Sequence, residues 1–190
     1  MNLLFEAAWE INIFLRQHSI GYAIIGGLAV QKWGDIRFTK DVDLSVSTPL
    51  KDGASDLVRL IIAHFRSRVD DPVDFAKRNR MILVAASNGV EIDISLSLPG
   101  YEDEMFVHAI DFELEPGKTI RLCSAEDLII HKAVAGRPQD IADIEGIVYR
   151  QGNKLDLRYI HLWLKEFAQL LEEPDVLNRF EGAWLKYQAD

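Results

Sequence analysis

An unbroken alternation of apolar and polar residues over residues 90–98 is the feature that most constrains the fold. Side chains that alternate with a period of two lie on opposite faces of a β-strand, so this segment predicts a strand with one buried face. Its polar face carries Glu91 and Asp93. A second strand-like run covers residues 81–87, and the Asn-Gly pair at 88–89 between the two runs is typical of a hairpin. The chain is therefore expected to contain an antiparallel strand pair with carboxylates along one strand.

Residues 41–47 show the same alternation, and their polar face carries Asp41 and Asp43. The rise per strand residue places the two Cα atoms about 7 Å apart. Carboxylates this close repel each other unless a cation lies between them. Mg²⁺ takes oxygen ligands and commonly combines carboxylates with substrate phosphates. The alternative is a solvated strand face with two ordinary surface aspartates.

Asp93 would join Asp41 and Asp43 if the hairpin and this strand belong to one sheet. Three carboxylates on one sheet face suit a two-metal site, and such sites drive in-line phosphoryl or nucleotidyl transfer. Glu91 lies on the same face as Asp93 and competes with it for this place. We prefer Asp93 because it is central in its strand and has the shorter side chain.

Gly26 and Gly27 separate a strand-like apolar run over residues 20–25 from a short helical pattern over residues 28–33. A strand, a glycine pair and a helix in this order can present backbone N–H groups and a helix N-terminus to an anion. The alternative is a plain tight turn. The position of the glycine pair ahead of the aspartates favours a phosphate cradle.

Together these residues resemble the nucleotidyltransferase superfamily that shares the DNA polymerase β-type palm. Within it, they most resemble the AbiEii/AbiGii-like branch of toxin nucleotidyltransferases. The resemblance covers about residues 20–150 and rests on two motifs in addition to Asp93. The first motif comprises Gly26, Gly27, Ala29, Gly34, Arg37, Thr39, Asp41 and Asp43, and the later helical motif comprises Lys132, Arg137, Asp140 and Asp143.

The resemblance implies a role for each matching residue. Asp93 is implied to bind metal and to activate the attacking hydroxyl. The implied catalytic and metal-binding residues are Asp41, Asp43 and Asp93, with Mg²⁺ in a two-metal site and Mn²⁺ as a possible substitute. The implied nucleotide-binding residues are Gly26, Gly27, Thr39 and Lys132, and the implied supporting residues are Arg37, Asp140 and Asp143.

Two positions depart from the pattern of the family. Many relatives have Gly-Ser where this chain has Gly26-Gly27, so backbone donors or Thr39 must serve the phosphate instead. Pro138 stands where a polar residue is more usual, and it is expected to separate the helix of Lys132 from the next one. Asp140 and Asp143 would then lie near a helix start, where acidic residues are also favoured simply by the helix dipole.

The chain is expected to form an α+β structure with a nucleotidyltransferase fold. Helices flank a mixed β-sheet in this expectation, and a C-terminal helical bundle closes the cleft, as in relatives of the superfamily. We expect an α/β core with an N-terminal helix over residues 1–122 and a helical region packed on it over residues 123–190. The patterns further predict helices over 3–18 and near 54–68, a strand pair around 115–118, and four helices over 125–188, broken at 136–138, 151–153 and 173–174.

Composition limits the class of protein. A chain of 190 residues that is 48% hydrophobic can bury a sizeable core. No apolar run approaches the length that spans a bilayer, and the N-terminus shows no basic leader with a cleavage site. Cys123 is the single cysteine, which excludes an internal disulfide framework. These features predict a cytoplasmic protein without a membrane segment.

The net charge of −9 disfavours a general nucleic-acid-binding surface. A basic cluster is the best candidate for contact with an RNA acceptor, and its alternative is a solvated face balanced by nearby acids. The cluster comprises Arg66, Arg68, Lys77, Arg78 and Arg80, and the balancing acids are Asp70, Asp71 and Asp74. The acidic residues between 102 and 115 indicate no function beyond solubility.

The expected function is Mg²⁺-dependent transfer of a nucleoside monophosphate from a nucleoside triphosphate, ATP among the candidates, to a hydroxyl acceptor. The acceptor could be RNA, tRNA or protein, and a toxin-like transferase would have an antitoxin protein as partner. One alternative is a catalytically retired module that binds nucleotide or a partner protein. Another is an antibiotic-modifying nucleotidyltransferase, which would share the site. The sequence leaves the acceptor, the preferred base and the oligomeric state open.

Overall fold

The computed structural model describes residues 2–48 and 53–189, which fall into two compact units. The first unit lies within residues 1–28 and 38–123, and the second within residues 29–37 and 124–190. The second unit thus includes residues 29–37, whereas the sequence prediction assigned them to the α/β core over residues 1–122. The two units are described separately below.

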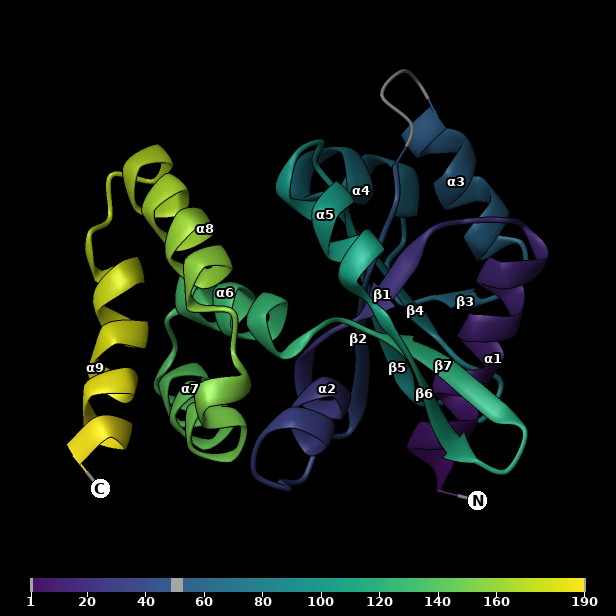
Figure 1. Ribbon diagram of the computed structural model, residues 1–190. Coiled ribbons are helices and arrows are strands. Elements are labelled where there is room, and N and C mark those ends of the chain that lie inside the picture. Colours follow the sequence, from purple (N-terminus) through teal and green to yellow (C-terminus); the bar gives the residue numbers. More distant parts are fainter. Residues whose placement is uncertain (1, 49–52, 190) are drawn as a thin grey trace. The chain divides into compact units, whose positions relative to one another are not determined.

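The first unit is built on a mixed sheet of seven strands among the described residues (Figure 1). Strand β2 pairs in parallel with β5, and β1 pairs in parallel with β7, while all other neighbours are antiparallel. The strands in spatial order are β3 (Arg66–Ser67), β4 (Met81–Ala85), β5 (Glu91–Leu96), β2 (Asp41–Val46), β1 (Tyr22–Ile24), β7 (Lys118–Leu122) and β6 (Ile110–Glu115).

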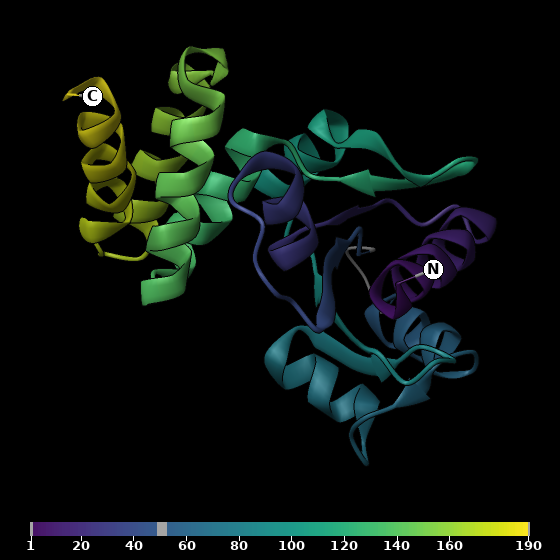
Figure 2. The same ribbon diagram turned by 90° about the horizontal axis from the view of Figure 1, so that it is seen from below.

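Helices complete the first unit. They are α1 (Leu3–Gln17), α2 (Gly26–Trp33), which continues into the second unit, α3 (Gly53–Ile62), α4 (Pro72–Asn79) and α5 (Tyr101–His108). Helices α1 and α3 lie side by side on one face of the sheet in both views (Figures 1 and 2). Their apolar side chains join Leu44, Ile92 and Ile94 in one hydrophobic core. This face of β2 and β5 is therefore closed to solvent, which leaves their polar residues on the opposite face.

Over residues 124–189, the second unit contains four α-helices, as the sequence predicted. They are α6 (Ala125–Ala135), α7 (Pro138–Gln151), α8 (Leu157–Leu170) and α9 (Asp175–Ala189), with a short 3₁₀ turn at Gly152–Lys154. Gly136 ends α6 in the left-handed conformation, and Pro138 occupies the first turn of α7, so the predicted break between these helices is confirmed. The helices pack through fully buried residues such as Ile129, Ile144 and Phe180.

The predicted strands at 41–47, 81–87 and 90–98 and the hairpin at 88–89 are confirmed with slightly shorter bounds. The helix predicted near 54–68 is wrong in extent, because α3 ends at Ile62 and Arg66–Ser67 pairs with β4 as an edge strand. Helices α4 and α5 were not predicted. The start of α4 does carry a recognisable pattern, since Asp71 caps it and Pro72 stands in its first turn.

Two further expectations concern single features. Cys123, the single cysteine of the chain, is buried and forms no disulfide bond within it. Searched over residues 2–48 and 53–189, the helices include none with the length and apolar character needed to cross a membrane.

Candidate functional site

The predicted carboxylates meet on one face of the sheet. Strands β2 and β5 run in parallel and in register, so that Asp43 lies beside Asp93 and Asp41 lies beside Glu91. The condition set by the sequence, that the hairpin joins the strand of Asp41 and Asp43, is therefore met. Because the alternate residues Leu44 and Ile94 are fully buried, the four carboxylates all belong to the opposite, polar face.

The glycine pair approaches two of these polar residues closely. Gly26 follows β1 with φ of +60° and begins α2. A Cβ atom on Gly26 would lie 2.1 Å from Asp43 Oδ2, and one on Gly27 would lie 2.3 Å from Thr39 Oγ1. Any side chain at these two positions would collide with Asp43 or Thr39. The backbone at the start of α2 is thus held directly against the proposed metal and phosphate residues.

Thr39 orients a carboxylate in this structure. Its Oγ1 donates a hydrogen bond to Asp41 Oδ1 at 3.0 Å. On the neighbouring strand, the backbone N–H of Ile25 donates to the carbonyl of Asp43 at 2.9 Å, which extends the pairing of β1 and β2 up to the glycines. The contact between Thr39 and phosphate stays a prediction.

Arg68 reaches the same sheet face, and its place there was not predicted. The backbone N–H of Arg68 donates to the carbonyl of Leu83 at 2.9 Å, and Leu83 is paired with Asp93 across β4 and β5. From there the guanidinium forms an ion pair with Asp93, and its Nη2 contacts Glu91 Oε2 at 2.5 Å. One arginine therefore bridges the two carboxylates of β5.

Two other arginines of the basic cluster, Arg78 and Arg80, have separate partners. Arg78 pairs with Asp74 at 2.6 Å within α4. Arg80 donates to the backbone carbonyls of Leu96 at 2.9 Å and Ser97 at 2.5 Å. The cluster that looks continuous in sequence is thus divided among a carboxylate pair, a helix surface and the end of β5.

Glu102 corrects the expectation that the acidic segment serves only solubility. Its Oε1 accepts a hydrogen bond from the hydroxyl of Ser45 at 2.6 Å, and its Oε2 accepts one from the backbone N–H of Leu98 at 2.6 Å. Ser45 follows Asp43 on the polar face of β2. Glu102 therefore links the first turn of α5 to β2, next to the strand residues Asp41 and Asp43.

The residue types of this face fit a hard divalent cation, since Asp41, Asp43 and Asp93 all offer carboxylate oxygens. Gly26 adds a cradle against Asp43 that a Cβ would fill. Among residues 2–48 and 53–189, however, no three His, Cys, Asp or Glu side chains are grouped so that they could hold a metal ion. The divalent-metal site stays a prediction.

The later helical motif forms a buried charge network in the second unit. Lys132 Nζ lies 2.7 Å from Asp140 Oδ1 and 2.8 Å from Asp143 Oδ2. Arg137 Nε contacts Asp140 Oδ2 at 2.6 Å, and Arg37 Nε contacts Asp143 Oδ1 at 2.8 Å. Lys132 precedes Pro138 in the sequence and Asp140 and Asp143 follow it, and all three are buried. The ammonium of Lys132 is engaged by both carboxylates here, and its contact with phosphate stays a prediction.

Burial on its own would raise the pKa of Asp140, but hydrogen bonds from Arg137 and Lys132 outweigh it and lower that pKa below its usual value. Asp143 behaves in the same way, with Arg37 and Lys132 as its donors. Both carboxylates are thus held in the charged form.

The stability of the protein is expected to fall with acidification because of these two aspartates. A carboxyl group whose pKa is lowered by folding contributes stability that is present above the unfolded pKa of about 4. That contribution is lost as the pH falls through the lowered pKa of the folded protein. Unfolding in denaturant at successive pH values between 6 and 2 checks this, with ~4 as the expected onset. A free energy of unfolding that stays constant or rises on acidification would contradict it.

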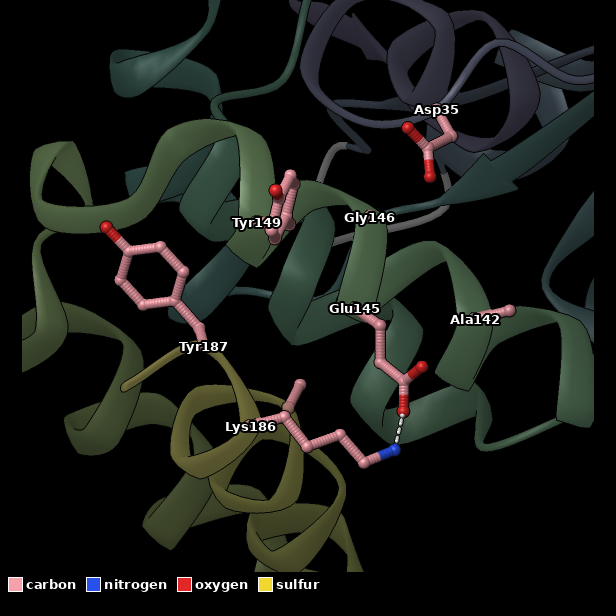
Figure 3. A pocket seen from close by; sticks show the side chains of 8 residues that line it. Asp35, Ala142, Glu145, Gly146, Tyr149, Lys186 and Tyr187 are labelled. Carbon is pink, nitrogen blue, oxygen red and sulfur yellow. Dashed lines mark hydrogen bonds and ion pairs between the residues drawn. The ribbon is translucent and has the colours of Figure 1, made fainter. Parts of the chain in front are cut away.

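The second unit contains a pocket that is lined by none of the predicted site residues. Its volume is about 430 Å³, and Lys186 pairs with Glu145 at 2.5 Å within it (Figure 3). Its lining consists of Asp35, Ala142, Glu145, Gly146, Tyr149, Ala183, Lys186 and Tyr187. None of these residues belongs to either motif, so the candidate site remains the polar face of β2 and β5.

Comparison with known proteins agrees with this geometry. The model of the family described as "Nucleotidyl transferase of unknown function (DUF2204)" matches residues 5–180. An antigenic nucleotidyltransferase-like protein from Paracoccidioides brasiliensis is similar in structure, with a TM-score of 0.55, 19% identity, and coverage of 94% of this chain and 92% of that chain. ANT(2")-Ia in complex with adenylyl-2"-tobramycin has a TM-score of 0.50 and 14% identity, with coverage of 98% and 99%.

These similarities bear out the predicted fold, which is a nucleotidyltransferase fold with a mixed sheet and flanking helices. The resemblance to the superfamily is also borne out, whereas the assignment to the AbiEii/AbiGii-like branch stays a prediction. No curated protein sequence matches the chain.

Proposed function

We propose that this chain, which belongs to the family described as nucleotidyl transferases of unknown function (DUF2204), moves a nucleoside monophosphate from a triphosphate to a hydroxyl acceptor in a Mg²⁺-dependent reaction. The observation that carries the proposal is the in-register pairing of Asp41 and Asp43 with the strand of Asp93. The glycine turn that lies against Asp43 and Thr39 adds to its support.

Asp41, Asp43 and Asp93 would hold Mg²⁺, or Mn²⁺ in its place. Bound divalent cations supply Lewis-acid stabilisation of the attacking and leaving oxygens. Asp93 would also accept the proton of the attacking hydroxyl. The hydroxyl oxygen then bonds to the α-phosphorus, the bond from that phosphorus to the bridging oxygen breaks, and pyrophosphate leaves. The backbone N–H groups of Gly26 and Gly27 would donate to triphosphate oxygens.

The later helical motif receives a supporting role in this proposal. The pairing of Lys132 with Asp140 and Asp143, and of Arg37 with Asp143, favours a part in holding the second unit together. Contact between Lys132 and phosphate is the role that the family resemblance implies. It would require Lys132 to exchange one of these carboxylates for the ligand.

The acceptor is proposed to be a hydroxyl of RNA, tRNA or protein, as in a toxin-like transferase with an antitoxin as partner. Modification of an antibiotic is the second candidate. It is favoured by the structural similarity to ANT(2")-Ia, whose complex contains an adenylylated tobramycin. The net charge of −9 is compatible with a cationic acceptor of that kind.

Incubation of the protein with each labelled nucleoside triphosphate and Mg²⁺ tests the proposal. Total cellular RNA, a protein extract and an aminoglycoside serve as separate acceptors. We expect label on one acceptor and none when EDTA removes the metal. Label on the aminoglycoside alone would favour the antibiotic-modifying alternative. Thermal stabilisation by nucleotide and Mg²⁺ without label on any acceptor would favour the catalytically retired module.

A further inference from the structure

We propose that the first unit binds a small organic anion, with a carboxylate or phosphate headgroup, in a cavity lined by Arg16 and Arg121. The cavity has a volume of about 430 Å³, which lies in the range of small-molecule sites. Its lining consists of Arg16, Ser19, Ile20, Gly21, Tyr22, Phe106, Asp111 and Arg121. None of these residues was assigned to nucleotide transfer, so the cavity is a separate candidate site.

The cavity forms where the end of α1, the residues before β1 and the paired strands β6 and β7 come together. Arg16 lies in the last turn of α1, and residues 19–21 lead into β1. Gly21 precedes β1 whereas Gly26 follows it, so the cavity and the glycine pair belong to opposite ends of this strand. Tyr22 correspondingly pairs with Val46, at the far end of β2 from the aspartates.

The charged residues of the lining favour an anion. Arg16 and Arg121 supply two positive charges and Asp111 supplies one negative charge, which leaves one positive charge in excess. The chain as a whole has a net charge of −9, so the cavity is locally of the opposite sign. A guanidinium presents a planar fork of N–H donors that matches the oxygens of a carboxylate or a phosphate.

Arg121 is held at the wall of the cavity with donors to spare. It lies opposite Asp111 across β6 and β7, a placement in which opposite charges commonly pair. Its Nη2 instead donates to the backbone carbonyl of Phe106 at 2.8 Å. This bond fixes the guanidinium and uses only one of the five N–H donors that such a group carries. Further donors of the same fork can therefore serve an oxyanion.

Arg16 can exchange its present partner for a ligand at little cost. Its Nη2 pairs with Asp111 Oδ1 at 2.9 Å, and the two side chains are 49% and 57% exposed. Ion pairs as exposed as this one contribute little to stability. An anionic ligand therefore competes with Asp111 for Arg16, and Asp111 is expected to weaken the binding of anions.

Tyr22 adds a fixed polar group without a charge. The residue is only 3% exposed, and its hydroxyl donates to Asn12 Oδ1 and accepts from the backbone N–H of Arg121 at 3.2 Å. Burial raises the pKa of this hydroxyl, although the N–H of Arg121 and the side chain of Arg16 act in the opposite direction. The phenol therefore stays neutral at physiological pH and does not repel an anion.

The size of the cavity and the presence of Ile20 and Phe106 in its lining indicate that the ligand has an organic body beside its charged group. Titration of the full chain with small probes, followed by amide shifts in proton–nitrogen NMR spectra, tests this. Benzoate and phenyl phosphate combine both parts, whereas inorganic phosphate lacks the body and benzyl alcohol lacks the charge.

We expect benzoate or phenyl phosphate to cause saturable shifts at Gly21, Tyr22 and Arg121, with a dissociation constant of about 1 mM. Inorganic phosphate and benzyl alcohol should bind about tenfold more weakly. The tighter of the two aromatic anions identifies the headgroup. Equal binding of benzyl alcohol, or the absence of saturable shifts with both aromatic anions, would overturn the proposal.

Substitution of either arginine should weaken the binding of the aromatic anions. Arg16→Met and Arg121→Met each remove a charge-assisted contact, which corresponds to a loss of about tenfold. Arg59→Met is the matched control, since Arg59 pairs with Asp56 on α3 of the same unit and its side chain is 66% exposed. It should retain the affinity within about twofold. A loss in the control as large as in Arg16→Met would mean that only the overall charge matters, which contradicts a built site.

Asp111→Asn should have the opposite effect and tighten the binding about threefold, because it releases Arg16 and removes a negative charge from the cavity. Asp111 is exposed, so this variant keeps the test valid if Arg121→Met fails to fold. Unchanged or weaker binding by Asp111→Asn would overturn the proposal. Shifts at Gly26 and Asp43 without shifts at Gly21 would also overturn it, since they would place the anion at the glycine pair.

Discussion

Nucleotide transfer is expected to fall by about a thousandfold or more when Asp41 and Asp43 are both replaced by asparagine, since metal ligation contributes several kcal/mol to such reactions. Asparagine has nearly the shape of aspartate. Its amide oxygen can still accept the hydrogen bond that the Thr39 hydroxyl donates to Asp41 Oδ1 in the wild type. The change therefore removes two negative charges and leaves the packing beside Gly26 in place. Labelled transfer at saturating Mg²⁺ measures the loss.

The control for this variant is Asp56→Asn with Asp74→Asn. These two carboxylates are exposed and pair with Arg59 and Arg78 on helix surfaces of the same unit, so the net charge changes by the same amount away from the sheet face. The control should retain transfer within about twofold, as expected for surface substitutions. Mg²⁺-dependent transfer by a folded Asp41→Asn/Asp43→Asn variant would show that the site is assigned wrongly.

The alternating pattern was enough to predict the strands of the site and the face on which each carboxylate lies. A period of two specifies which side chains share a face, and the buried Val42 and Ile92 confirm this for β2 and β5. The pattern says nothing about which strands become neighbours. The parallel register of β2 and β5, which places Asp43 beside Asp93, came from tertiary packing.

Arg68 shows where prediction from the sequence ended. It lies 25 positions before Asp93, in a segment whose charges suggested a surface for RNA. The helix expected there stops at Ile62, and the following edge strand turns Arg68 toward β5. Edge strands of two residues carry no periodic pattern, so neither the strand nor the partner of Arg68 could be derived from local residues.

Helix α5 was not predicted from the sequence, for a different reason. Only Tyr101 and Met105 of its eight residues are buried, and its first turn is acidic, so its composition resembles a solvated loop. The contact from Glu102 to Ser45 depends on residues 57 positions apart. Such a contact follows from the fold and leaves no local pattern in the chain.

We expect the substitution Lys132→Met to lower the free energy of unfolding, because it removes one member of the charge network of the second unit. Lys132 lies between Asp140 and Asp143, and both carboxylates are buried. Methionine matches the length of the aliphatic stem but leaves each aspartate with a single arginine partner. Removing one member of a buried charge network is expected to cost about 3 kcal/mol. Chemical denaturation, followed by the helix signal in circular dichroism, measures the free energy of unfolding.

Lys186→Met is the matched control, because Lys186 pairs with Glu145 in the same unit but its side chain is 71% exposed. An exposed pair of this kind contributes less than about 1 kcal/mol and is screened by salt. The loss in Lys132→Met should persist in about 1 M salt, since buried pairs are screened much less. If Lys132→Met is as stable as Lys186→Met, or if salt abolishes the difference, the network does not hold the helices together. Lys132 would then be available for the phosphate contact that the family resemblance implies.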